Sequence, residues 1–139
     1  MIEGKSEEIQ QPMKLVGIAA CAGDVEGPAY WVSSGSRGGL IPGQFLLSPA
    51  QRATKAKDFP RGAVLISAMT SPDLLPAMRK ASAIVTGLGG RTCHAAIVSR
   101  ELRIPCVVGV GRGALEQFVK DGTMLRVKGA EGLVEILEG

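Results

Sequence analysis

The residues best suited to chemistry lie in the segment Gly89–Ala96, which reads Gly-Gly-Arg-Thr-Cys-His-Ala-Ala. His94 in this segment is the only histidine of the chain. A neutral imidazole nitrogen can attack phosphorus and carry the phosphoryl group covalently, and imidazole titrates near neutral pH, so its free base is available. The glycine pair lets a phosphate approach the backbone, and the helix predicted to start here offers free N–H groups and a positive dipole end. The segment therefore predicts a phosphoryl acceptor at His94.

The three residues between the glycines and His94 each allow two interpretations. Thr92 is a good N-cap residue, and its hydroxyl suits either the helix end or a phosphate oxygen. Arg91 suits either pairing with a phosphate or simple solvation. Cys93 is interpreted as a small packing or phosphate-contacting residue, because adjacent side chains diverge on a helix and would not form a catalytic Cys–His pair. The simpler alternative for the segment is an ordinary strand-to-helix turn with a surface histidine.

A second motif, Thr70-Ser71-Pro72-Asp73, is a helix-start signal, with cap candidates around a proline that suits a first turn. Pro76 follows closely, so the regular helix is predicted to begin near Leu75 and to run to Lys80. We expect this motif mainly to start the helix and, as a second role, to form one wall of the active face.

Apolar runs separated by glycine and proline predict strands and short helices. Strands are predicted at Lys14–Ala20, Ala29–Ser33, Phe45–Leu47, Ala63–Ala68, Ala83–Thr86 and Ile104–Val110, with a closing hairpin of Met124–Val127 and Leu133–Leu137. Further helices are predicted at Thr92–Leu102 and Ala114–Phe118. The strand–helix alternation in the middle implies parallel strands with crossovers, and the glycine-punctuated ends imply an antiparallel component. The fold class is α/β with a mixed parallel and antiparallel sheet.

Length and composition indicate one globular domain. The chain has 139 residues, of which 45% are hydrophobic and 21% charged, and a net charge of +3. Residues 1–12 are predicted to form a flexible polar tail, and residues 13–139 a single domain. Scattered lysines and arginines argue against nucleic-acid binding, and no apolar run reaches the roughly 18 residues that span a membrane. The tail does not resemble a secretory signal, so we expect a cytoplasmic protein.

Cys21, Cys93 and Cys106 form an odd set without a Cys-x-x-Cys pair. This usage indicates reduced thiols, as in cytoplasmic proteins. A zinc site built from these cysteines and His94 is the alternative, but the paired spacing of structural zinc sites is missing. We therefore expect no metal site in this chain.

The run Gly89–Gly109, GGRTCHAAIVSRELRIPCVVG, resembles the phosphohistidine or swivelling domain of the phosphoenolpyruvate (PEP)-utilising enzymes. That family includes PEP synthase (pyruvate, water dikinase), pyruvate phosphate dikinase and the phosphotransferase that starts bacterial sugar uptake. Cys93 before the histidine is most similar to the synthase branch, since the other two branches usually have serine there. The resemblance covers roughly Gly17–Gly132, is strongest over Ala63–Gly109, and implies a three-layer β/β/α swivelling domain.

The resemblance also implies site residues. His94 would be the catalytic residue and would accept phosphate on the ring nitrogen remote from the backbone. Phosphate-binding and supporting roles are implied for Gly89, Gly90, Arg91, Thr92 and Cys93, with Thr70 and Ser71 in support. The segment Gly23–Pro28 matches the G-x-x-x-G motif near the start of the family's domain. Gly87-Leu88, in contrast, stands where the family often has acidic residues.

The implied activity is that of a phosphotransferase component that is incomplete without other domains. A PEP synthase also needs a nucleotide-binding domain and a barrel domain that holds Mg²⁺ and pyruvate, and neither fits in this chain. We expect Mg²⁺, ATP and PEP on those partner domains or subunits, and no cofactor here, since the chain has no P-loop and no acidic cluster suited to Mg²⁺. A separate carrier subunit is favoured, and a domain of a longer protein is the alternative.

Three functions compete at this point. The first is a phosphoryl carrier from ATP through His94 to an acceptor, with pyruvate as the default and phenol, rifamycin or glucan left open. The second is a regulatory or docking module that keeps the fold but not the transfer, motivated by Gly87-Leu88 and the missing domains. The third is a cysteine- or zinc-based enzyme, which predicts bound metal or thiol-dependent hydrolysis.

Overall fold

The computed structural model describes residues 13–32, 57–70 and 72–138. The strands in these ranges are β1 (Met13–Val16), β2 (Ile18–Cys21), β3 (Asp24–Trp31), β4 (Val64–Ser67), β5 (Ala83–Thr86), β6 (Cys106–Val108), β7 (Met124–Lys128) and β8 (Leu133–Glu138). The helices are α3 (Leu75–Lys80), α4 (His94–Leu102) and α5 (Arg112–Phe118), with short 3₁₀ turns at Pro72–Leu74 and Gly129–Glu131. The predicted tail 1–12 and the predicted strand Phe45–Leu47 lie outside the described residues.

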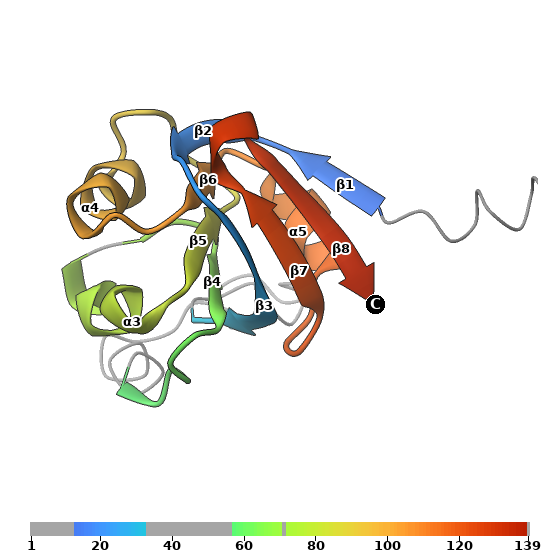
Figure 1. The fold of residues 1–139 in the computed structure, drawn as a ribbon, viewed down its shortest axis with the longest axis horizontal. Coiled ribbons are helices and arrows are strands. Elements are labelled where there is room, and N and C mark those ends of the chain that lie inside the picture. Colours follow the sequence, from blue (N-terminus) through green and yellow to red (C-terminus); the bar gives the residue numbers. More distant parts are fainter. Residues whose placement is uncertain (1–12, 33–56, 71, 139) are drawn as a thin grey trace, which may run out of the picture.

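The strands form one mixed sheet in the order β1-β8-β7-β3-β4-β5-β6-β2. The neighbours β3, β4, β5 and β6 are parallel, and the remaining pairs are antiparallel. In chain order, α3 connects β4 to β5 and α4 connects β5 to β6 (Figure 1). This arrangement confirms the predicted α/β class with a mixed sheet.

Gly17 divides the first predicted strand into two. The run Lys14–Ala20 predicts one strand, but β1 pairs with β8 at one edge of the sheet and β2 pairs with β6 at the other. The Gly17 N–H donates to the Gly132 carbonyl at 2.8 Å, and a Cβ at Gly17 would lie 2.6 Å from the Val108 carbonyl oxygen. The prediction of one strand is wrong because the chain crosses from one edge to the other here, at a point too crowded for a side chain.

β3 begins earlier than the predicted strand Ala29–Ser33. It pairs with β7 over Asp24–Pro28 and then with β4 from Ala29 onward, so this one strand joins the antiparallel and parallel parts. Gly27 reads as a turn signal in the sequence, yet a Cβ there would lie only 3.0 Å from the Gly62 carbonyl oxygen. Glycine inside a strand often marks such a close approach of two backbones.

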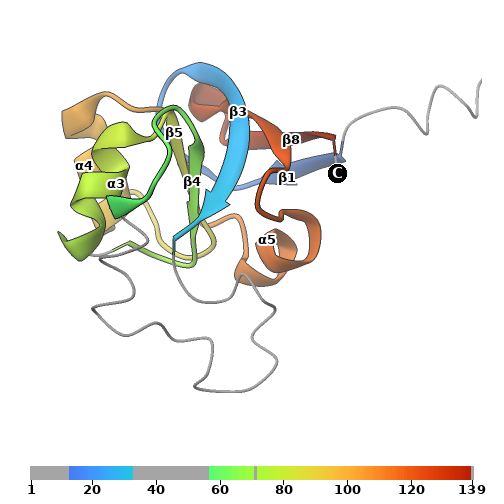
Figure 2. The ribbon, with the colours of Figure 1, turned by 90° about the horizontal axis from the view of Figure 1, so that it is seen from below.

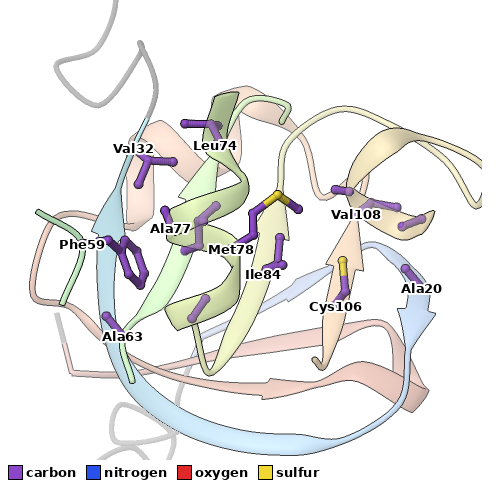
Figure 3. Packing of buried hydrophobic residues seen from close by; sticks show 14 residues of the cluster. Ala20, Val32, Phe59, Ala63, Leu74, Ala77, Met78, Ile84, Cys106 and Val108 are labelled. Carbon is purple, nitrogen blue, oxygen red and sulfur yellow. The ribbon is translucent and has the colours of Figure 1, made fainter. Parts of the chain in front are cut away.

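Buried side chains pack in two clusters, one on each face of the central strands. One cluster lies beneath α3 and includes Met78, Ile84 and Cys106 (Figure 3). The other includes Leu115 of α5 and Val127 of β7. Figures 1 and 2 show α3 and α4 on one side of the parallel strands, with α5, β1 and β8 on the other. The predicted three-layer β/β/α architecture is thereby confirmed.

The helix after the Thr70-Ser71-Pro72-Asp73 motif begins where the prolines predict. Pro72–Leu74 forms a 3₁₀ turn, and α3 then runs from Leu75 to Lys80. Its last turn carries two basic residues, which interact favourably with the negative end of the helix dipole. None of the helices in the described ranges has the length and apolar content needed to cross a lipid bilayer.

Hydrogen bonds continue the parallel sheet beyond the ends of β4, β5 and β6. The Gly87 N–H donates to the Ser67 carbonyl at 3.0 Å, and the Val110 N–H donates to the Thr86 carbonyl at 3.1 Å. The loops that follow these three strands are therefore stacked against one another. They lie at the carboxyl ends of parallel strands, where α/β proteins commonly bind ligands.

Candidate functional site

His94 is the first residue of α4. Cys93 before it occupies the N-cap position, with an extended backbone and no capping hydrogen bond from its side chain. The predicted helix Thr92–Leu102 thus begins two residues later than expected, and of the two interpretations of Thr92 the N-cap is wrong. The Cys93 N–H donates to the Gly90 carbonyl at 3.1 Å, and this turn closes before the helix starts. The N–H groups of residues 94–96 lie in the first turn of α4, so the helix itself offers them no carbonyl acceptor.

The ring of His94 is held by Thr70, in the loop after β4. Thr70 Oγ1 and His94 Nδ1 are 2.8 Å apart, a hydrogen bond whose direction depends on the ring tautomer. Thr70 is 9% exposed, and His94 is half-buried. Among the described residues, no group forms a hydrogen bond with His94 Nε2. One ring nitrogen is therefore engaged by the protein, and the other is available.

A pocket of about 160 Å³ lies beside this pair. It is lined by the loops after β4 and β5 and by the first turn of α4: Met69, Thr70, Thr86, Leu88, Gly89, Cys93, His94 and Ala95. Its volume is below the roughly 300–1,000 Å³ of sites for drug-sized ligands, so it suits a small group. Most of the lining surface is apolar, so a group bound there is partly shielded from water.

The pocket brings together four of the predicted site residues: Thr70, Gly89, Cys93 and His94. The other predicted phosphate-binding residues, 90–92, lie in the adjacent turn and do not line the pocket. Arg91 and Thr92 of that turn are exposed. Ser71 lies outside the described residues.

Gly89 occupies a backbone conformation that other residues rarely adopt, with φ of +117°. A Cβ at this position would lie 2.8 Å from Cys93 Sγ. The Cys93 side chain thus packs against the bare Cα of Gly89, in agreement with its interpretation as a small packing residue. Both residues shape the wall of the pocket next to His94.

The turn before the helix is rich in unused hydrogen-bond donors. The N–H groups of residues 89–92 have no acceptor among the described residues. A Cβ at Gly90 would have no neighbouring atom within 4 Å, so the space beside the turn is open. With the N–H groups of residues 94–96 at the positive end of α4, the turn provides donors of the kind that bind anions.

Two buried hydroxyls at the strand ends were not predicted as part of the site. Thr86 Oγ1 donates to the Leu88 carbonyl at 2.6 Å, and Ser67 Oγ donates to the Met69 carbonyl. Ser67 and Thr86 are register partners on β4 and β5. A signal for them is present in the sequence, since each hydroxyl residue directly follows an apolar run, in Ala-Val-Leu-Ile-Ser and Ala-Ile-Val-Thr. These bonds fix the backbone from which Met69 and Leu88 project, 58% and 42% exposed.

The thiols lie near one another, and Cys106 is the most deeply buried of them. Burial raises the pKa of the Cys106 thiol to about 12, and the nearby thiols of Cys93 and Cys21 act in the same direction. Cys106 is therefore protonated at neutral pH and is a poor nucleophile. Over the described ranges, no three His, Cys, Asp or Glu side chains are grouped so as to hold a metal ion.

Comparison with known proteins identifies relatives. Residues 59–132, just over half of the chain, match the family described as PEP-utilising enzyme, mobile domain. PEP synthase of Escherichia coli is 61% identical over 71 residues, which is 51% of this chain and 9% of that protein. A probable PEP synthase of Archaeoglobus fulgidus is 39% identical over 132 residues, which is 95% of this chain and 15% of that protein. The chain thus spans only a small part of the length of these relatives.

Solved structures show the same fold. A solution structure of Enzyme I (nEIt) has a TM-score of 0.50 and 35% identity, covering 58% of this chain and 33% of that chain. Aconitase X of Thermococcus kodakaraensis has a TM-score of 0.57 and covers 91% of this chain and 99% of that chain, but at 22% identity the likeness is one of fold alone. The predicted resemblance is confirmed by the family match and by the PEP synthases, and the chain belongs to the mobile-domain family of PEP-utilising enzymes.

Proposed function

We propose that this chain is a phosphoryl carrier that accepts a phosphoryl group on Nε2 of His94 and passes it between sites on partner domains. The observation that supports this most is the 2.8 Å hydrogen bond between Thr70 Oγ1 and His94 Nδ1. It occupies the nitrogen nearer the backbone and leaves Nε2 without a partner among the described residues, on a side chain that lines a small pocket and follows a turn with unused N–H donors.

The proposed tautomer carries its proton on Nδ1, which donates to Thr70 Oγ1, so that Nε2 keeps its lone pair. With PEP as donor, this lone pair attacks phosphorus and forms the N–P bond as the bond from phosphorus to the enol oxygen breaks. The leaving enolate takes up a proton and becomes pyruvate. The ring becomes cationic, keeps its Nδ1 proton, and is stabilised by the Thr70 hydroxyl. Transfer to an acceptor oxygen breaks the N–P bond and restores the neutral ring.

The surroundings of His94 fit a transferable phosphoryl group. Unused N–H groups in the turn 89–92 and at the start of α4 suit the negative charge of its oxygens. The half-exposed side chains of Met69 and Leu88 at the pocket limit the access of water to the labile N–P bond. We assign phosphate contacts to the backbone of Gly89, Gly90, Arg91 and Thr92, and a packing role to Cys93.

The donor and acceptor sites are proposed to lie on partner domains or subunits that bind ATP and PEP or pyruvate. These partners would also hold the Mg²⁺ that phosphoryl transfer from ATP requires. The support is the match to a mobile domain and the identity with PEP synthases, of which this chain spans 9–15% of the length in the two relatives described above. Pyruvate is the default acceptor.

A labelling experiment tests the carrier function in two arms. In the first, phosphoramidate is added to the purified chain, which tests whether Nε2 reacts without any partner. In the second, labelled PEP or ATP is added with a cell extract that supplies partners. The label is expected to be stable in alkali, labile in acid and absent from His94→Ala, with circular dichroism confirming that this variant is folded. Labelling retained in His94→Ala would refute the assignment.

The second candidate is a docking or regulatory module that does not take part in transfer. Leu88 exposes an apolar side chain at a position where the family often has acidic residues, and this favours the second candidate. Modification by phosphoramidate without any labelling from PEP or ATP in the extract would support this alternative. Labelling from either substrate would exclude it.

A further inference from the structure

Arg100, in the last turn of α4, bonds two backbone carbonyls outside its own helix. Its Nη2 donates to the Arg91 carbonyl at 2.6 Å, and its Nε donates to the Ala20 carbonyl of β2 at 3.0 Å. One acceptor belongs to the turn that precedes His94, and the other to an edge strand of the sheet. A single planar guanidinium thus joins the turn, the helix and the sheet.

The turn has few other fixed contacts of its own. Across residues 89–92, no backbone N–H has an acceptor in the part of the chain that the structure describes. The turn is closed by the hydrogen bond from the Cys93 N–H to the Gly90 carbonyl. Gly89 and Gly90 also give it more conformational freedom than other residues would. The bond from Arg100 is therefore a major restraint on where this turn lies relative to α4.

We infer that Arg100 is a positioning residue for phosphoryl transfer at His94, an inference that rests on the function proposed above. The Arg91 C=O and the Thr92 N–H belong to one planar trans peptide and point in opposite directions. When Arg100 holds the carbonyl, it also fixes the direction of the Thr92 N–H, an unused donor of the turn. Donors fixed in advance stabilise developing charge better than donors that must reorganise.

The simpler role for Arg100 is a solvated cation at the end of a helix, where it interacts with the dipole. A lysine would serve that role equally well. Lysine cannot reproduce the two directed bonds, because its ammonium is a single point of charge on a flexible stem. The variant Arg100→Lys therefore separates the two roles.

The test measures the rate at which phosphoramidate phosphorylates His94 in the complete chain. Nε2 attacks phosphorus, a new N–P bond forms, the old P–N bond breaks, and ammonia leaves with its proton. Arg100→Lys is expected to slow this reaction by about tenfold or more, as small misplacements of a reacting site do. The matched control is Arg79→Lys, at the corresponding exposed end of α3, which should react at the wild-type rate.

Chemical rescue provides a readout that a merely structural role would not change. Added ethylguanidinium should restore the rate in Arg100→Ala, whereas ethylammonium at the same concentration should not. In the wild-type protein, NMR couplings across the hydrogen bonds from Arg100 to the Arg91 and Ala20 carbonyls test the contacts without any variant. Their absence would overturn the inference even if the variants failed to fold.

The outcomes distinguish this inference from the proposed function. A wild-type chain that phosphoramidate cannot modify would refute the carrier function itself. A reactive wild type with an equally reactive Arg100→Lys would leave the carrier function standing and would overturn the role of Arg100. A slow Arg100→Lys with an unchanged melting temperature, together with rescue by ethylguanidinium, would establish it.

Discussion

The loops after β4 and β5 share a backbone design but contribute different groups to the pocket. In each loop, a buried hydroxyl at the strand end, Ser67 or Thr86, donates to the carbonyl two residues later. The next position differs: the first loop presents the side chain of Thr70, which bonds the His94 ring, and the second presents Gly89, which has no side chain. One loop therefore orients the histidine, and the other leaves room beside it.

This difference separates two requirements of the site. Orientation of a ring needs one specific hydroxyl at one distance, whereas the approach of a phosphoryl group needs bare backbone. The shared strand-end hydroxyls are suited to fixing the backbone in both loops, and the residue that follows decides what each loop does. Variants of the two loops should therefore fail in different ways.

The largest effect is expected from Gly89→Ala. Its positive φ and the 2.8 Å approach of Cys93 Sγ leave no room for a Cβ without strain. The free energy of unfolding should fall by about 1–3 kcal/mol, the usual cost of such a backbone conformation for a residue other than glycine. Urea denaturation measures this, with Gly90→Ala as the matched control, because the space around Gly90 is open. Equal stabilities of the two variants would contradict the structure of the second loop.

Thr70→Val tests the first loop. Valine keeps the shape of threonine but leaves His94 Nδ1 without its partner, so the ring loses its fixed tautomer and orientation. Phosphorylation by phosphoramidate should slow by about tenfold to a hundredfold, as when other histidines lose their orienting partners. Thr70→Ser should retain most of the rate, and ¹⁵N NMR of the ring reports the tautomer directly. A wild-type rate in Thr70→Val would show that the hydroxyl does not matter.

A smaller effect is expected from Thr86→Val, which removes the bond to the Leu88 carbonyl while keeping the side-chain volume. The loss in stability should be about 1 kcal/mol, the net contribution of one hydrogen bond. Because Thr86 forms no hydrogen bond with Thr70, the His94 tautomer should remain as in the wild type. A change of tautomer would show that the contact between the loops, in which the Leu88 N–H donates to the Ala68 carbonyl at 2.9 Å, carries the disturbance to His94.

The smallest effect is expected at the residue that ends α4, beyond Arg100. Arg103 is the described residue other than glycine with a positive φ, 60°, in the left-handed position that ends the helix. Arg103→Gly should raise the melting temperature, with a gain of about 0.5–1 kcal/mol in the free energy of unfolding. Arg103→Ala should give no gain. A change in the phosphorylation rate of Arg103→Gly would mean that overall stability, rather than the loops, controls the site.

Local signals in the sequence predicted much of the fold. The apolar run Ala83–Thr86 forms β5, and the spacing of prolines gave the bounds of α3, Leu75–Lys80. Both features depend on residues within one element, where burial and backbone restriction act over a few positions. The glycine-rich segment before His94 was likewise recognisable, because its residue types and their order carry the information.

Features that depend on distant contacts were not predictable in the same way. Gly17 looks like a minor break in an apolar run, and only its packing against Val108 shows that the chain changes edges there. Thr92 has good N-cap chemistry, but the turn closed by Gly90 moves the cap to Cys93. The bond from Arg100 to β2 joins residues 80 positions apart, and no local pattern indicates it.

The pairing of β1 with β8 has a mechanical consequence. Met13 lies opposite Ile136, so the described chain enters and leaves the sheet at one edge, and Figures 1 and 2 show that edge on the side away from α3 and α4. Any polypeptide attached before Met13 or after Glu138 would therefore pull on the same place. A domain held at one edge rotates about that edge. A small rotation there moves the opposite side of the domain, with α4, over a long distance. On the function proposed above, such a rotation would carry His94 between distant sites without any rearrangement inside the domain.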